Sequence, residues 1–261
     1  MQFSEPAIRF AAFGAVLLAM LIAEAVWPRR ARSHSRWRRW PSNLGIVALD
    51  TLLVRLVAPL GAVGIAEFAA ARHWGLFNLV ETPLALAAVL SFGALDLAIW
   101  AQHVAFHKVR LLWRFHRMHH ADTDFDTTTA LRFHPGEILL SLAIKAGVVV
   151  LLGAPAAAVV AFEIALNATS MWNHANLRLP SRLDALLRLV LVTPDMHRVH
   201  HSWRPEETNS NYGFNFPWWD RLFGTYRPQP ADSHDGMTIG LSAFRDEDEL
   251  RLDRMLTQPF R

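Results

Sequence analysis

The sequence contains no cysteine among its 261 residues. That absence excludes disulfide bonds, cysteine-ligated zinc, iron–sulfur clusters and thiol catalysis. Charge is also scarce, because only 19% of the residues are charged while 52% are hydrophobic. This composition is too apolar for an ordinary soluble domain and is typical of a chain with several membrane helices. The net charge is only +3, so the charge balance does not indicate a nucleic-acid partner.

The sequence contains five long apolar runs. Each approaches the length of about 20 residues that a helix needs to cross a bilayer. The first lacks a basic leader and a small-residue cleavage site, so we interpret it as a membrane span and not as a signal peptide. Gly153-Ala154-Pro155 separates the last two runs and predicts a helical hairpin. The expected spans are residues 6–27, 44–71 (broken near Pro59), 83–106, 137–152 and 155–172.

Six arginines lie between the first two runs, at positions 29, 30, 32, 36, 38 and 39. The positive-inside rule places this segment in the cytoplasm. If each predicted span crosses the membrane once, the span ends that carry histidines lie on the cytoplasmic side. Everything from residue 175 onward then lies on that side as well. The sequence therefore predicts an all-α integral membrane protein with about four to five membrane helices and a cytosolic helical cap that carries histidine clusters. We expect it in the inner, cytoplasmic membrane, with a charged amphipathic helix over residues 244–256.

Histidine is plentiful, with 13 copies. Eight of them fall into three clusters with spacings of three or four residues, which put side chains on one helical face, and the isolated His174 is taken with them as a ninth. Nine imidazoles exceed what one ion accepts, so the spacing predicts two metal ions. Iron, zinc, copper and nickel all suit such ligands, whereas a pH sensor would not need so many histidines. The predicted ligands are His103, His107, His116, His119, His120, His174, His197, His200 and His201.

Four other residues are candidates for positions beside the metals. His134 is either a tenth ligand, a hydrogen-bond partner of a ligand or a helix start before Pro135, and we place it near the site but not on a metal. Asp96 precedes His103 by seven residues and is expected to orient a ligand imidazole, with pairing to another intramembrane charge, such as Arg55, as the alternative. Glu137 and Asp195 either accept hydrogen bonds from ligands or begin helices.

These motifs resemble the fatty acid hydroxylase and sterol desaturase superfamily of membrane-bound non-haem di-iron oxygenases. The shared patterns are D-x-x-x-aromatic-x-x-H-x-x-x-H from Asp96 to His107, H-x-x-H-H from His116, HPGE from His134, the lone His174, and TPDMHRVHHS followed by NYG and WWDRLFGTY. They cover roughly residues 94–227. Two departures stand out: Ser170 occupies a position where many relatives have histidine, and Trp100 one where many have tyrosine.

The resemblance implies two iron ions, with zinc as an alternative in purified protein, and dioxygen as co-substrate. It implies oxidation of a C–H bond in a fatty acyl, sterol or isoprenoid-type lipid, with electrons from a separate donor protein. We expect residues 1–261 to form one membrane-embedded oxygenase domain with a family-like core at about 83–227 and a cytosolic tail at 228–261. Hydroxylation is the preferred outcome and desaturation the alternative. A zinc-dependent lipid hydrolase and a metal transporter are more distant alternatives.

Overall fold

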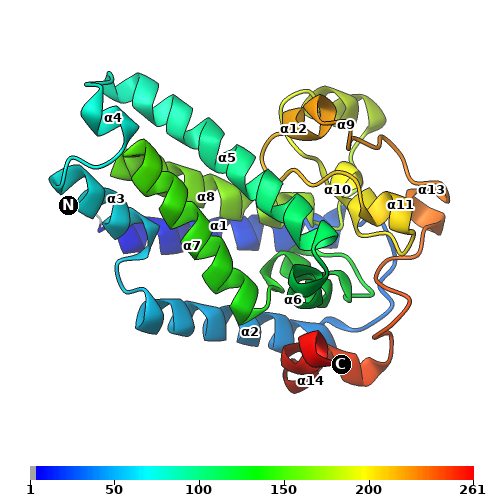
Figure 1. The fold of residues 1–261 in the computed structure, drawn as a ribbon. Helices are drawn as coiled ribbons and strands as arrows, with labels where there is room; N and C mark the ends of the chain where they lie inside the picture. Colours follow the sequence, from blue (N-terminus) through cyan, green and yellow to red (C-terminus); the bar gives the residue numbers. More distant parts are fainter. Residues whose placement is uncertain (1–3) are drawn as a thin grey trace.

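The computed structural model describes residues 4–261, and within them the chain is helical with no β-strand. Five long helices form a bundle, and most of the shorter helices gather at one end of it as a cap, while the short α3 (Gly61–Ala71) and α4 (Leu76–Leu79) lie at the other end (Figure 1). The bundle helices are α1 (Glu5–Val26), α2 (Arg36–Val57), α5 (Leu84–Lys108), α7 (Pro135–Leu152) and α8 (Ala156–Asn173). The fold is thus the all-α architecture that the composition and the apolar runs predict.

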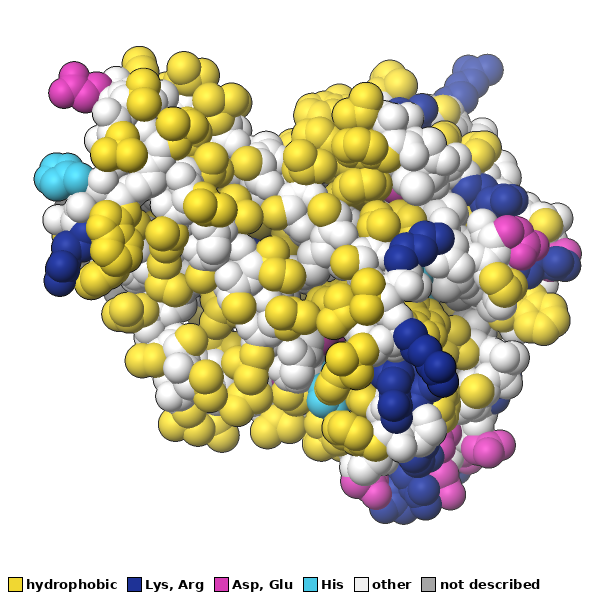
Figure 2. Space-filling view, in the orientation of Figure 1, with side chains coloured by type: hydrophobic (Ala, Val, Ile, Leu, Met, Phe, Trp, Pro, Cys, Tyr) yellow, Lys and Arg dark blue, Asp and Glu magenta, His cyan; other side chains and the backbone are white. Residues whose placement is uncertain are grey.

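Four segments are long and apolar enough to cross a membrane: Glu5–Val26, Arg36–Leu79, Leu84–Lys108 and Pro135–Leu152. Figure 2 shows hydrophobic side chains over most of the bundle surface, with the charged side chains concentrated around the cap. A bundle with an apolar exterior is stable only when lipid surrounds it. The chain is therefore an integral membrane protein, as the apolar runs predict.

The second expected span begins earlier than the sequence pattern indicates. Helix α2 starts at Arg36 instead of residue 44, so half of the arginine-rich segment is helical. Arg39 is fully buried there, and its guanidinium pairs with Asp122 at 2.6 Å and with Asp126 at 2.7 Å. The expected break is confirmed, because α2 ends at Val57 and α3 (Gly61–Ala71) follows.

The hairpin of α7 and α8 is confirmed and turns on Gly153, whose φ of +66° lies in the left-handed region. A residue with a side chain would be strained in that conformation. The short connection before α4 (Leu76–Leu79) packs directly on this turn, and a Cβ added to Gly75 would lie only 2.0 Å from the Gly153 nitrogen. Two glycines therefore let two backbone segments meet at the end of the bundle opposite the cap.

A buried ionic cluster ties three bundle helices together. Glu163 on α8 accepts from Lys145 on α7 at 2.6 Å and from Arg9 on α1 at 2.8 Å. Charges inside a membrane protein are costly unless they are paired. The contacts thus explain how α8 carries a carboxylate in its middle.

The C-terminal residues form no continuous amphipathic helix, so that expectation is wrong. The segment divides into a 3-10 turn at Glu247–Leu250 and a short helix α14 (Leu252–Thr257), because Arg251 between them is extended. Met255 of α14 is buried against Ile46 of α2 and Met118 of α6 (Arg110–His120). Tertiary contacts with two other helices thus replace the regular helix that the charge pattern favours.

Candidate metal centre

The nine predicted ligands meet where the bundle joins the cap. Helix α5 supplies His103 and His107, and the next helix, α6, supplies three more after a break at Val109. His174 follows the last residue of α8. The remaining three come from α10 (Pro194–His200) and the residue after it; that helix starts at Thr193, whose hydroxyl accepts from the Met196 N–H. Four chain segments that are distant in sequence thus converge on one site.

The histidines form two groups, and within each group the candidate ligand nitrogens lie within 4.8 Å of one another. The first, the five-histidine group, consists of His103, His107, His116, His120 and His200. The second, the four-histidine group, consists of His119, His174, His197 and His201. His119 and His120 are neighbours in sequence but belong to different groups, as are His200 and His201.

The five-histidine group is built around converging Nε2 atoms. His103 Nε2 lies 3.0 Å from His116 Nε2 and 3.0 Å from His200 Nε2, and His120 Nε2 lies 3.2 Å from His116 Nε2. Nitrogens that bind one metal at about 2.1 Å lie about 3.0 Å apart at right angles and about 3.4 Å apart at tetrahedral angles. The observed separations therefore match the spacing of ligands around one ion.

Hydrogen bonds on the far side of each ring fix which nitrogen carries the proton. The Nδ1 atoms of His103 and His200 lie 2.7 Å from the backbone carbonyls of Tyr212 and Ser210, which can only accept. Both rings therefore hold their proton on Nδ1 and present a lone pair on Nε2. Lone pairs 3.0 Å apart repel one another unless a cation lies between them. The tautomers thus indicate a metal position more strongly than the spacing alone.

The four-histidine group has the same convergence with fewer supports. His174 Nε2 lies 3.1 Å from His119 Nε2 and 3.2 Å from His197 Nε2, and its Nδ1 donates to the Ser170 carbonyl at 2.8 Å. The Nδ1 atoms of His119 and His197 and both nitrogens of His201 are buried and have no hydrogen-bond partner within residues 4–261. Buried unpaired nitrogens are costly, and a bound metal would satisfy one nitrogen of His201 together with the converging Nε2 atoms. The Nδ1 atoms of His119 and His197 would still have no acceptor within the described residues.

Burial keeps the imidazoles in the form that metals bind. It lowers the pKa of His116 and of His174, each to about 3. Burial likewise lowers the pKa of the other ligands outside the membrane helices well below the usual value for histidine. Those residues are His119, His120, His197, His200 and His201. Neutral nitrogen donors without any thiolate suit iron, zinc, copper or nickel, so the residues fit a pair of such ions.

Glu137 lies where the sequence analysis expects an acceptor. Its Oε1 atom is 2.7 Å from His116 Nδ1, and both side chains are buried. His134 lies close by but belongs to neither histidine group. Its Nδ1 accepts from the Gly136 N–H at 3.0 Å and its Nε2 donates to the Leu256 carbonyl at 3.2 Å. Of the three roles open to His134, the structure supports the helix start.

The two aspartates do not lie against ligand imidazoles. Asp96 accepts from Asn215 and from Trp219, each at 2.8 Å, and seven residues of helix put it about 10 Å along α5 from His103. Neither role considered for it, orienting an imidazole or pairing with an intramembrane charge, is found among the described residues. Asp195 lies in the first turn of α10, which fits the helix-start alternative, and it pairs with Arg198 three residues later, while Thr193 caps the helix. Asp96 and His103 lie on the same face of α5, but the short aspartate side chain cannot reach an imidazole about two helical turns away.

Several supporting groups have no signal in the sequence because they are backbone atoms. The Tyr212 carbonyl that holds His103 belongs to a loop organised by buried Asp220, whose carboxylate accepts from the N–H groups of Tyr212 and Gly213 at 2.9 and 2.8 Å. Trp100 on α5 also donates to Asp220, at 3.1 Å. The shared motifs contain Asp220, but only the structure connects it to a ligand.

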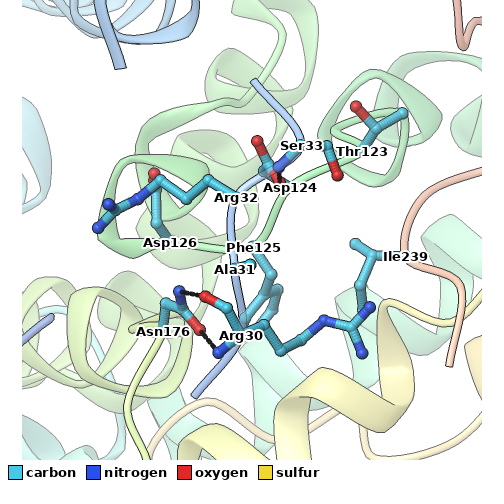
Figure 3. Close-up of a pocket in the computed structure, with 10 residues that line it drawn as sticks. All are labelled: Arg30, Ala31, Arg32, Ser33, Thr123, Asp124, Phe125, Asp126, Asn176 and Ile239. Atoms are coloured by element: carbon cyan, nitrogen blue, oxygen red, sulfur yellow. Dashed lines mark hydrogen bonds between the residues drawn. The ribbon is translucent and has the colours of Figure 1, made fainter. Parts of the chain in front are cut away.

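One side of the site is apolar and the other is polar. Phe133 stacks on His119 with ring centroids 4.4 Å apart, Phe214 lies 5.1 Å from His103, and both belong to the hydrophobic core of the bundle. On the opposite side, Figure 3 shows a polar pocket formed by segments 30–33 and 123–126, in which Asn176 bonds to the Arg30 backbone. Phe125 separates this pocket from His174, 5.5 Å from its ring. The site therefore lies between lipid-like packing and a polar surface.

An apolar helical bundle with two all-histidine groups, each of which could hold a metal ion, is typical of a membrane metalloenzyme. In agreement, the family model described as fatty acid hydroxylase matches residues 88–225. The matched range includes all nine histidines. The chain belongs to this family, as the motif resemblance predicts, and it is an oxidoreductase.

The chain is also similar in sequence to proteins of known activity. An ornithine lipid hydroxylase of Rhizobium tropici is 27% identical over 87% of this chain and 71% of its own length. The alkylglycerol monooxygenase of Xenopus tropicalis is 26% identical over 80% of this chain and 46% of its own length. The human alkylglycerol monooxygenase is 27% identical over 59% of this chain, which spans 34% of that protein. No solved structure matches the chain.

Proposed function

We propose that the chain is a membrane-bound lipid hydroxylase that uses two iron ions, dioxygen and electrons from a separate protein. The net reaction converts R–H, O2, two electrons and two protons into R–OH and water. One oxygen atom enters the C–H bond, and the other leaves as water. When bound, the irons supply the dioxygen chemistry that an unactivated C–H bond requires.

The observation that carries this proposal is the convergence of nine imidazoles, eight of them buried, in two groups on the edge of an apolar core. Glu137 has a defined part, because its Oε1 atom keeps a proton on Nδ1 of His116 and so leaves Nε2 free to bind. Phe133 and Phe214 exclude water from the side on which a hydrocarbon chain would lie. A dry, apolar approach favours oxidation of the substrate over unproductive loss of the oxidant to water.

The substrate class follows from the same apolar side. We expect a fatty acyl or alkyl chain of a membrane lipid, since a flexible chain fits between helices that pack aromatic and aliphatic residues. The named relatives are consistent with this class, because they act on ornithine lipid or on alkylglycerol. Sterol and isoprenoid lipids are rigid or branched and are less favoured.

Electrons would enter from the polar side. Phe125 lies between the polar pocket and the four-histidine group, with its ring 5.1 Å from His201. Arg30 and Arg32 line the same pocket together with Asp124 and Asp126, and the arginine-rich segment beside it supplies the further cationic side chains that an acidic donor protein would contact. The arginine-rich segment lies at this end, so we expect the site to face the cytoplasm of an inner membrane.

The test is a lipid comparison in a bacterial host that expresses the chain under iron-replete conditions. We expect a lipid that has gained one oxygen atom, and about two irons per purified chain, consistent with two groups of three or more imidazoles. His201→Ala should lose the lipid product and about one of the two irons, because it removes one candidate ligand of the four-histidine group. The matched control is His73→Asn, because His73 is exposed at the opposite end of the bundle and its φ of +55° suits asparagine.

Other products would contradict the proposal in distinct ways. A lipid that has lost two hydrogens identifies a desaturase, and a cleaved lipid with zinc bound identifies a hydrolase. A protein that binds two irons but changes no lipid, while a known hydroxylase does so in the same host, would overturn the proposed activity.

A further inference from the structure

Part of the cap has an apolar surface that the proposed reaction does not use. Along α9 (Ser181–Leu187) and the residues after it, every exposed side chain from 183 to 190 is apolar. The helix α12 (Trp218–Leu222) and Phe223 continue this surface, and the Trp218 indole donates to the Leu189 carbonyl at 2.7 Å, which joins the two parts. We name this surface the apolar edge. Its exposed residues are Leu183, Leu186, Leu189, Val190, Trp218, Leu222 and Phe223.

The apolar edge lies beside the middle of a membrane helix and not above its end. Phe216 packs 5.9 Å from Phe92, Trp219 donates to Asp96, and Phe223 stacks on Trp100 at 4.6 Å. At about 1.5 Å per residue, positions 92 to 100 lie about 12 to 24 Å from the start of α5, inside a hydrocarbon layer of about 30 Å. These contacts bring a segment of the cap down to bilayer depth.

Figure 2 agrees with this placement. It shows hydrophobic side chains over α9 and α12, facing the apolar far end of α5 across a hollow in the surface. The lipid-facing surface of α5 includes Val89, which is 69% exposed. The apolar edge is thus continuous with a surface that must contact lipid.

The backbone and the charges of the apolar edge are arranged as a membrane requires. Non-helical backbone at bilayer depth must have its polar groups satisfied within the protein. The carbonyl of Arg188 accepts from Arg221 at 3.1 Å, in addition to the bond between Leu189 and Trp218. The Arg188 side chain is buried against Asp184 at 2.7 Å, and the Arg221 guanidinium lies over the Tyr226 ring at 4.1 Å. The exposed charged residues of α9 and α12 are Arg182 and Arg221, and a long arginine side chain at such a position can extend its guanidinium to the headgroup layer.

We propose that the apolar edge of the cap lies inside the lipid bilayer beside α5, so that the cap is partly embedded and does not rest in water above the membrane. The occupant of this surface is the hydrocarbon of the membrane itself. This inference does not depend on which reaction the metal centre catalyses, because it uses no residue of that centre.

The absence of cysteine from the whole chain allows a direct test. Single variants Leu186→Cys and Leu222→Cys would carry a nitroxide label in the intact protein, reconstituted in vesicles of phosphatidylethanolamine and phosphatidylglycerol. Val89→Cys is the lipid-exposed reference. Glu206→Cys, on an exposed residue of α11 (Pro205–Thr208), is the water-exposed reference. The readout is collisional relaxation by oxygen, which enters lipid, and by a nickel chelate, which stays in water.

We expect both labels on the apolar edge to match Val89, with strong relaxation by oxygen and loss of relaxation by nickel. Relaxation by nickel equal to that of Glu206 would overturn the proposal. Protection from both reagents would also overturn it, because a second protein copy would then cover the surface, and cross-linking would reveal that dimer. Metal content, measured on the same samples, verifies that each variant is folded.

Discussion

The two histidine groups differ in how firmly the protein holds them. In the five-histidine group, three rings are fixed by acceptors on Nδ1, namely a carboxylate and two carbonyls. In the four-histidine group only His174 has such support, and three rings have at least one buried nitrogen without a partner among residues 4–261. Acceptors on the second nitrogen orient a ligand and raise its basicity. We therefore expect the two groups to bind metal unequally, and the four-histidine group to release its ion more easily.

Adjacent histidines give the largest test of this inequality. His119→Ala leaves three ligands in its group, whereas His120→Ala leaves four in the other. We expect both variants to lose product formation, and His119→Ala to lose about one metal ion per chain because three imidazoles bind more weakly than four. His120→Ala should retain more metal. Elemental analysis of both purified variants checks this; equal retention would show that the two groups do not differ.

Acidification should weaken both positions in a defined window. Burial lowers the pKa of His116 and His174 to about 3, whereas unfolded histidine titrates near 6.5. Between these values the unfolded chain binds more protons, so stability is fully present above about pH 6.5 and declines as pH falls toward about 3. We expect thermal unfolding of metal-free protein in detergent to shift to lower temperature over this range. A midpoint that stays constant from pH 7 to about 4 would contradict the neutral state of the rings.

Removing the hydrogen-bond acceptor of one ligand should make the five-histidine group bind metal almost as weakly as the four-histidine group. Glu137→Gln keeps the size of the side chain but removes the charge that holds the proton of His116 Nδ1. We expect metal affinity at this position to fall by about 10- to 100-fold, as for other partners of metal-bound histidine. Competition with a chelator measures the change. If the chelator removes metal from Glu137→Gln at the same rate and concentration as from the wild type, Glu137 does not change the metal affinity of the five-histidine group.

The smallest effect is expected at His134. Asparagine caps helices well, so His134→Asn should preserve the start of α7 and leave the metal content of both groups unchanged. The proper comparison is with His116→Asn, a true member of the five-histidine group. Loss of one ion from His134→Asn would make it a tenth ligand and would reverse the assignment made from its hydrogen bonds.

Local spacing made the ligand set predictable. Histidines three or four residues apart must share a helical face, and all nine candidates fall in one of the two groups. The same rule failed for Asp96, because a shared face does not bring a short carboxylate within reach across two helical turns. Glu137 was predictable only as one alternative of two, since its partner His116 lies on another helix.

Apolar runs and helical spacing are local properties, so the all-helical membrane architecture, the hairpin at Gly153 and the candidate ligands could be predicted from the amino-acid sequence. The division of nine histidines into five and four depends on the fold, because the side chains of the neighbours His119 and His120 point to different groups. The fold also decided which groups hold the rings, because backbone carbonyls such as that of Tyr212 are present in every residue and become specific only through folding.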